Sequence, residues 1–148
     1  TYNIRPAASE IDFVSYNTFM LPLLPEGIEY DPNREAFLLS SATGGAISLV
    51  RTDGSFSNLI PPAVFNGNGT FGLQIDTLNN RLLAVGGNFM NPTVSWLFRF
   101  DLETATLIDS INLAAVPTSP GLPLNFVNDV TVDKEGNAYV TNSDKGVI

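Results

Sequence analysis

The chain has 148 residues, a formal net charge of −8, and neither cysteine nor histidine. Without cysteine there is no disulfide framework and no thiolate chemistry, and without histidine there is no Ser-His-Asp triad and no imidazole-bound zinc site. The seven Lys and Arg residues stand singly along the chain, so the sequence has no footprint for nucleic acid or an anionic membrane. Cations, small molecules and other proteins are the partners that this composition favours.

No apolar run reaches the roughly 18 residues that a membrane-spanning helix needs, so we predict no membrane span. The chain begins at Thr1, so either an upstream segment has been removed or the sequence starts inside a longer chain. Asn68-Gly69-Thr70 is an N-glycosylation sequon in a loop rich in Gly and Asn. On these two features we expect a secreted or extracellular protein.

Residues 1–24 are expected to supply an N-terminal strand and to lead into the central tunnel of the propeller that the rest of the chain predicts. After them, a strand that runs into an acidic tight turn and out into an apolar strand occurs three times, over residues 27–40, 72–85 and 129–142. Each turn carries an aspartate in the same place, at Asp31, Asp76 and Asp133. The separations of 45 and 57 residues are close to the length of a four-stranded propeller blade.

Each of the first two repeats is followed by a second hairpin pattern. Residues 46–50 and 56–60 flank the turn Asp53-Gly54, and residues 95–100 and 105–111 flank a turn that starts at Asp101. Two hairpins make four strands per repeat, and no segment has the periodicity of a helix. The sequence therefore predicts an all-β fold, a partial β-propeller of about two and a half four-stranded blades.

We place the blades at residues 25–69, 70–125 and 126–148, within one domain that covers residues 1–148. The third range is only the start of a blade. A closed propeller exposes no radial blade face, whereas two and a half blades leave a face and several strand edges open to water. We therefore expect the ring to be completed by a second polypeptide, in a hetero-oligomer, or by a missing C-terminal half.

Two segments, Leu24-Pro25-Glu26-Gly27-Ile28 and residues 127–141, resemble the SMP-30/gluconolactonase/paraoxonase-like superfamily of six-bladed, calcium-dependent propellers. The resemblance implies that calcium, or another divalent cation such as magnesium, sits in the central tunnel. It implies that Glu26 and Asn128 are metal ligands and that Asp129 lies near the metal. The remaining ligands of the family come from later blades.

The chemistry of these residues fits that expectation, because a hard divalent cation prefers carboxylate and amide oxygens. The alternative is that Glu26 is a solvated loop residue and that Asn128-Asp129 is a turn bonded to its own backbone. For the three repeated aspartates, capping of the turn is the favoured interpretation.

The leading functional hypothesis is a divalent-metal-dependent hydrolase of lactones, esters or phosphotriesters, whose metal site is shared with missing blades. The alternative is a non-catalytic propeller that carries a pigment, lipid-like molecule or metabolite in a multi-chain assembly. Phe19, Phe71 and Phe126 are the candidate contacts for such an apolar ligand, but ordinary core packing is the favoured interpretation of these residues. A structural or adhesion propeller is a third possibility.

Overall fold

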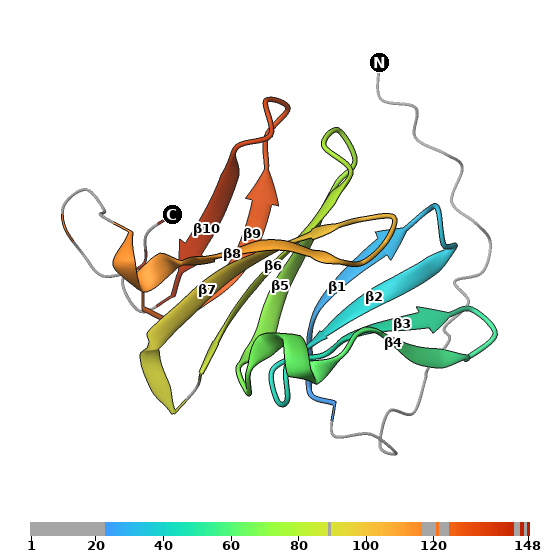
Figure 1. The fold of residues 1–148 in the computed structure, drawn as a ribbon, viewed down its shortest axis with the longest axis horizontal. Helices are drawn as coiled ribbons and strands as arrows, with labels where there is room; N and C mark the ends of the chain where they lie inside the picture. Colours follow the sequence, from blue (N-terminus) through green and yellow to red (C-terminus); the bar gives the residue numbers. More distant parts are fainter. Residues whose placement is uncertain (1–22, 89, 117–120, 122–124, 144–145, 147) are drawn as a thin grey trace, which may run out of the picture.

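The structure, a computed structural model, describes residues 23–88, 90–116, 121, 125–143, 146 and 148 (Figure 1). The N-terminal strand predicted within residues 1–24 falls almost entirely outside these ranges, and so does Phe19. The statements that follow concern the described residues.

Ten strands form three antiparallel sheets in which every strand pairs with its neighbour in sequence. The first sheet contains β1 (Pro25–Asp31), β2 (Ala36–Ser41), β3 (Ile47–Arg51) and β4 (Phe56–Ile60). The second contains β5 (Gly69–Asp76), β6 (Arg81–Asn88), β7 (Asn91–Asp101) and β8 (Leu107–Asn112), and the third contains β9 (Val127–Val132) and β10 (Ala138–Asn142). The only helical elements of the described chain are two 3-10 turns, η1 (Pro62–Phe65) and η2 (Leu113–Ala115), which confirms the all-β prediction.

The repeated aspartates cap the first hairpin turn of each sheet, as the sequence predicted. The Asp31 carboxylate accepts a hydrogen bond from the Asn33 backbone N–H at 3.0 Å, and Asp133 accepts one from the Glu135 N–H at 3.0 Å. Asp76 is 3% exposed. Burial disfavours its charge, but hydrogen bonds from Asn79 and Arg81 outweigh burial and hold the pKa of Asp76 below its ordinary value.

Two arginines connect these turns to the next sheet. Arg34 pairs with Asp31 and also donates to the backbone carbonyl of Glu103, at 2.7 Å, in the β7–β8 turn of the second sheet. Arg81 pairs with Asp76 and donates to the backbone carbonyl of Gly136 in the β9–β10 turn. Each buried carboxylate therefore orients an arginine that ties one sheet to its successor.

A buried apolar core joins the first sheet to the second. Leu38 and Leu49 of the first sheet belong to one cluster with Leu82 and Phe100 of the second. Phe65, from η1, fills the end of this core and packs edge to face on Phe98, with ring centroids 5.0 Å apart. The 3-10 turn that links the sheets therefore also supplies part of the apolar contact between them.

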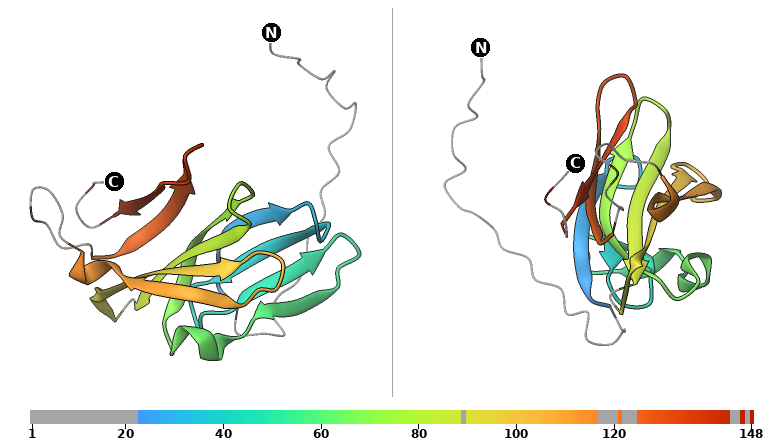
Figure 2. Two further views of the ribbon diagram at one scale, coloured as in Figure 1. Left: turned by 45° about the horizontal axis from the view of Figure 1, so that its top comes forward. Right: turned by 90° about the vertical axis from the view of Figure 1, so that its left-hand side faces the viewer.

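A second apolar core joins the second sheet to the third. It contains Leu83 and Val85 of β6 and Val127 and Val130 of β9, with Val140 of β10 packed against it. Because side chains alternate along β6, Leu83 and Val85 face the third sheet while their neighbours face the first. The second sheet is thus apolar on both sides, and Figure 2 shows it between the other two.

The hydroxyl of Thr70 is a buried polar link between the first two sheets. It accepts a hydrogen bond from the Ser41 backbone N–H at 3.0 Å and donates toward the Ala46 carbonyl at 3.1 Å. Thr70 is the third residue of the predicted sequon, so this hydroxyl has a structural role. The Nδ2 of Asn68 donates to the Phe65 carbonyl at 2.9 Å.

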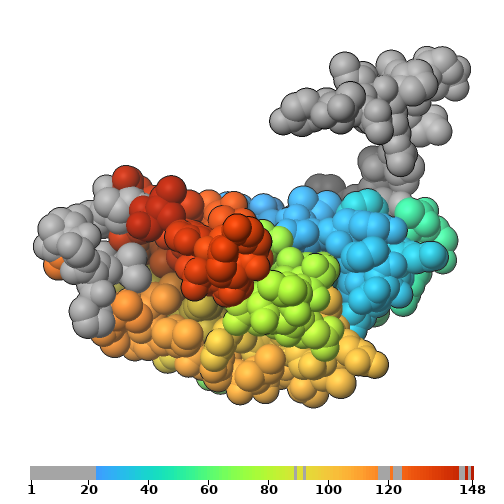
Figure 3. Space-filling view, turned by 90° about the horizontal axis from the view of Figure 1, so that it is seen from above, coloured from blue at the N-terminus to red at the C-terminus, as the bar shows by residue number. Residues whose placement is uncertain are grey.

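The first strands of the three sheets lie side by side, with β1 against β5 and β5 against β9. In Figure 3 the residues of β1–β2, β5–β6 and β9–β10 form a row across one surface. Two glycines permit this approach. A Cβ atom on Gly27 would lie 2.4 Å from the carbonyl oxygen of Phe71, and one on Gly72 would lie 2.5 Å from the Cα of Asp129. No other residue fits these positions without moving a neighbouring strand.

We expect Gly72→Ala to destabilise the protein by roughly 1–3 kcal/mol, because the added methyl group overlaps the backbone of β9. Urea unfolding followed by circular dichroism measures the change. Ser57→Ala, on the exposed side of β4, is the control and should change stability by less than about 0.5 kcal/mol. Equal stabilities of the two variants would contradict the close contact between β5 and β9.

Candidate functional site

Each of the three first strands has a register irregularity at the equivalent point of its repeat. In β1 it lies between Pro25 and Ile28, and in β5 between Thr70 and Leu73. In the third sheet, the three-residue step from Val127 to Val130 on β9 faces a two-residue step on β10. An extra residue of this kind breaks the strict alternation of side chains and re-aims those beside it.

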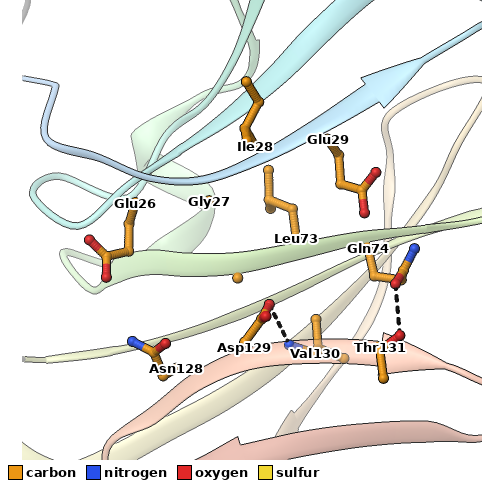
Figure 4. A pocket seen from close by; sticks show the side chains of 11 residues that line it. Glu26, Gly27, Ile28, Glu29, Leu73, Gln74, Asn128, Asp129, Val130 and Thr131 are labelled. Atoms are coloured by element: carbon orange, nitrogen blue, oxygen red, sulfur yellow. Dashed lines mark hydrogen bonds between the residues drawn. The ribbon is translucent and has the colours of Figure 1, made fainter.

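The three irregular segments surround a groove of about 360 Å³. Its lining consists of backbone and side chains from β1, β5 and β9, namely Glu26, Gly27, Ile28, Glu29, Gly72, Leu73, Gln74, Asn128, Asp129, Val130 and Thr131 (Figure 4). Three of these residues are carboxylates, two are amides and none is Lys or Arg. The groove therefore favours cations and disfavours anions.

All three residues predicted to bind metal line this groove. Glu26 comes from β1 and Asn128 and Asp129 come from β9, so the fold brings together the two segments that carried the prediction. Figure 4 shows Glu26 and Asn128 at the same end of the groove, with Asp129 beside them. The structure thus gives these residues a shared location, and their role as ligands stays a prediction.

The backbone of β9 holds Asp129 in place. Its N–H donates to the Thr141 hydroxyl of β10 at 2.9 Å, and its Oδ1 accepts from the Val130 N–H at 2.8 Å. The side chain is nevertheless exposed to the groove. Gly72 lies directly against it, since a Cβ there would be 2.3 Å from the same Oδ1.

Glu29 also lines the groove, and sequence reasoning did not identify it. Burial is the main cause that raises the pKa of Glu29 above its ordinary value of 4.5. The negative charge of Asp129 raises it further, while backbone hydrogen bonds at Tyr30 and Ile75 act in the opposite direction. Two carboxylates from different sheets therefore interact across the groove.

A signal for Glu29 was present in the repeats. Two residues before each capping aspartate, the three strands carry a polar residue among apolar neighbours: Glu29, Gln74 and Thr131. All three line the groove. The Thr131 hydroxyl donates to the Gln74 Oε1 at 3.0 Å, across the boundary between the second and third sheets. A polar position that recurs within an apolar strand could have indicated this second row of groove residues.

The donor set has the chemistry of a hard-cation site but is small. Carboxylate and amide oxygens suit calcium or magnesium, and no sulfur or imidazole competes with them. Among the described residues, however, no three side chains of the types His, Cys, Asp and Glu are grouped so that they could hold a metal ion. An ion bound to Glu26, Asn128 and Asp129 would need further oxygens from water or from another polypeptide.

The two described phenylalanines proposed for an apolar ligand are not among the residues that line the groove. Phe71 is 3% exposed and belongs to the core between the second and third sheets. Its ring stacks on Phe126, with centroids 6.2 Å apart and an interplanar angle of 29°. This burial is what core packing requires, so it favours packing over ligand contact for Phe71.

No protein-family model and no curated protein matches this sequence. Within the described residues, no helix is long and apolar enough to cross a membrane. The assignment of the groove therefore depends on its own residues.

We expect Glu29→Gln to stabilise the metal-free protein at neutral pH by about 0.5 kcal/mol, the size of a weak surface charge interaction. Folding raises the pKa of Glu29. Its contribution to the stability of the folded protein is therefore most favourable below its pKa in the unfolded chain, and declines as the pH rises through its pKa in the folded protein. The gain should therefore disappear at a pH well below the ordinary value of 4.5, where the Glu29 carboxyl is neutral in both the folded and the unfolded protein. Thermal unfolding with EDTA at a series of pH values measures it.

Glu103→Gln, at an exposed carboxylate in the β7–β8 turn, is the matched control for that measurement. A gain from Glu29→Gln that does not depend on pH, or that Glu103→Gln reproduces, would show that Glu29 is not crowded by negative charge in the groove.

Proposed function

We propose that the three sheets are successive blades of a partial β-propeller and that the groove between β1, β5 and β9 lies at its axis. The repeated connection of sheets, by one apolar core and one arginine at each boundary, supports this arrangement. In such a ring the first strand of each blade faces the axis, which is the position that β1, β5 and β9 share.

The function that the groove supports best is binding of a divalent cation in a hydrolase. The observation that carries it is the convergence of Glu26, Asn128 and Asp129, from sheets one and three, on a groove that no cationic side chain lines in the described chain. Calcium fits this oxygen donor set better than a softer metal would. Glu26 and Asp129 would bind it through carboxylate oxygens and Asn128 through its amide oxygen.

When bound, such an ion supplies Lewis-acid polarisation of a carbonyl or phosphoryl oxygen. The protein's own contribution is to hold the ligands and to place the substrate. The hydrogen-bonded pair Gln74 and Thr131 lines the same groove and offers donors and acceptors for a polar substrate group. Glu29 adds negative charge beside this pair, so the groove suits uncharged substrates such as lactones, esters and phosphotriesters better than anionic ones.

We expect calcium to raise the melting temperature of the wild-type protein and Glu26→Gln to weaken calcium binding at least tenfold, since it removes a charged ligand. Titration calorimetry with CaCl2 and MgCl2 measures the affinity, with Glu103→Gln as the charge-matched control. Equal affinities of the Glu26→Gln and Glu103→Gln variants would exclude Glu26 as a ligand.

We expect the assembled protein to hydrolyse neutral lactones or phosphotriesters and to lose this activity with EDTA, with recovery on addition of calcium. The isolated chain should be inactive because its ligand set is incomplete. Mass and absorption spectra of the natively purified assembly show whether it carries a bound pigment, lipid or metabolite. If the assembly carries a pigment or lipid, and if hydrolysis is absent or does not depend on the metal, the carrier hypothesis would replace the hydrolase hypothesis.

A further inference from the structure

A small pocket lies on the side of the first sheet that faces away from the second sheet. Leu38 of β2 and Leu49 of β3 belong to the core between these two sheets, so their neighbours Leu39 and Ser48 face the opposite side. We call this the outer side of sheet 1. The pocket on it has a volume of about 80 Å³. Among the residues that line it are Leu23, Ser41, Ser48, Phe56 and Asn58.

The chemistry and size of this pocket favour an apolar side chain. None of the described residues that line it is charged. The Ser48 hydroxyl donates to the Asn58 Oδ1 at 3.3 Å, and the Ser41 hydroxyl donates to the Thr43 carbonyl at 2.5 Å, so both hydroxyls already have partners. Sites for small organic ligands have volumes of about 300–1,000 Å³. The pocket is therefore much smaller than a ligand site and closer in size to a single side chain.

The second sheet has the same position, and there an aromatic side chain fills it. Ser48 of β3 pairs with Leu39 of β2. Phe98 of β7 pairs in the same way with Ala84 of β6. Leu39 and Ala84 each lie eight residues after the capping aspartate of their repeat, so Ser48 and Phe98 are equivalent. The ring of Phe65 packs on Phe98, whereas the smaller Ser48 is part of the wall of the pocket.

The side chain that packs on Phe98 comes from the segment just before the first strand of the second sheet. Phe65 is fully buried and lies 11 residues before the capping aspartate. Val64, next to it, is partly buried against the same core. Counted in the same way in the first repeat, the equivalents of Val64 and Phe65 are Phe19 and Met20, which are also apolar.

The chain enters the first sheet at the pocket. Leu23 lines it, and the carbonyl of the next residue, Leu24, accepts a hydrogen bond from the Ala42 N–H at 2.8 Å. This bond matches the pairing at the equivalent point of β5 and β6, which supports the count between the repeats. Met20 precedes Leu23 by three residues, a reach of at most about 11 Å. Residues 17–22 contain no charged side chain, as the uncharged lining requires.

We propose that Met20 occupies this pocket and that residues 17–22 dock on the outer side of sheet 1. These residues lie outside the described part of the chain, so the assignment depends on the pocket and on the repeat. Phe19 then packs beside Met20, as Val64 packs beside Phe65, and is a packing residue rather than a ligand contact. The inference goes beyond the proposed function and does not depend on the metal site.

Since the chain has no cysteine, a designed disulfide tests the location of Met20. If Met20 lies in the pocket, the variant with Met20→Cys and Asn58→Cys should form a disulfide within one chain under mild oxidation. The control combines Met20→Cys with Ser57→Cys, because residue 57 points to the opposite face of β4 and should not form the bond. Non-reducing electrophoresis and peptide mass spectrometry measure both yields. Equal yields, or disulfides only between chains, overturn the proposal.

The two methionines of the chain give an independent test on the unmodified protein. Met90 is 93% exposed, between β6 and β7. With dilute hydrogen peroxide, Met20 should form its sulfoxide several-fold more slowly than Met90, and the two rates should become equal in urea. Peptide mass spectrometry measures the rates. Equal rates in the folded protein overturn the proposal, and so does slow oxidation of Met20 without the disulfide to position 58.

Thermal unfolding measures the contribution of the docked side chain to stability. Met20→Ala should lower the melting temperature by about 4 °C or more, because it empties an apolar pocket. Met90→Ala makes the same change at an exposed position and should shift the melting temperature by less than about 2 °C. Equal shifts of the two variants contradict burial of Met20.

Discussion

The close approach of β1, β5 and β9 is the constraint on which the rest of the structure depends. Gly27 and Gly72 leave no room for a Cβ atom, so the backbone of each first strand lies against the next one. This contact sets the distance between the sheets, and the apolar cores and arginine bridges fit that distance. It also forces groups from three separate segments of the chain into one groove, where the sequence carries acids and amides.

Such crowding has an electrostatic consequence. The carboxylates of Glu29 and Asp129 come from different sheets and interact unfavourably, while burial adds to the cost of ionising Glu29. Under the proposed function, a cation bound in the groove would offset this repulsion and thereby stabilise the folded protein.

The hairpin turns at the opposite end of these strands contain buried carboxylates whose charges are compensated. Asp31 is fully buried, and its charge is compensated by backbone N–H groups and by Arg34. Asp76 and Arg81 repeat the arrangement. In each case Nη2 of the arginine donates to a backbone carbonyl of the next sheet, so the same side chain pairs with the capping aspartate and attaches one sheet to the next. Asp31 and Asp76 are therefore each paired with an arginine, whereas no Lys or Arg is among the described residues that line the groove.

The repeated strand and turn pattern of the sequence was enough to predict the all-β fold, the hairpins and the capping role of the repeated aspartates. These features depend on the alternation of side chains along a strand and on hydrogen bonds between residues a few positions apart, so short segments of the sequence determine them. The candidates Glu26, Asn128 and Asp129 came instead from the resemblance of two short segments to the calcium-dependent propellers. Only the tertiary structure placed them in one groove, added Glu29 and put Phe71 in the core. Those outcomes depend on register shifts and on contacts between sheets, which local sequence patterns do not specify.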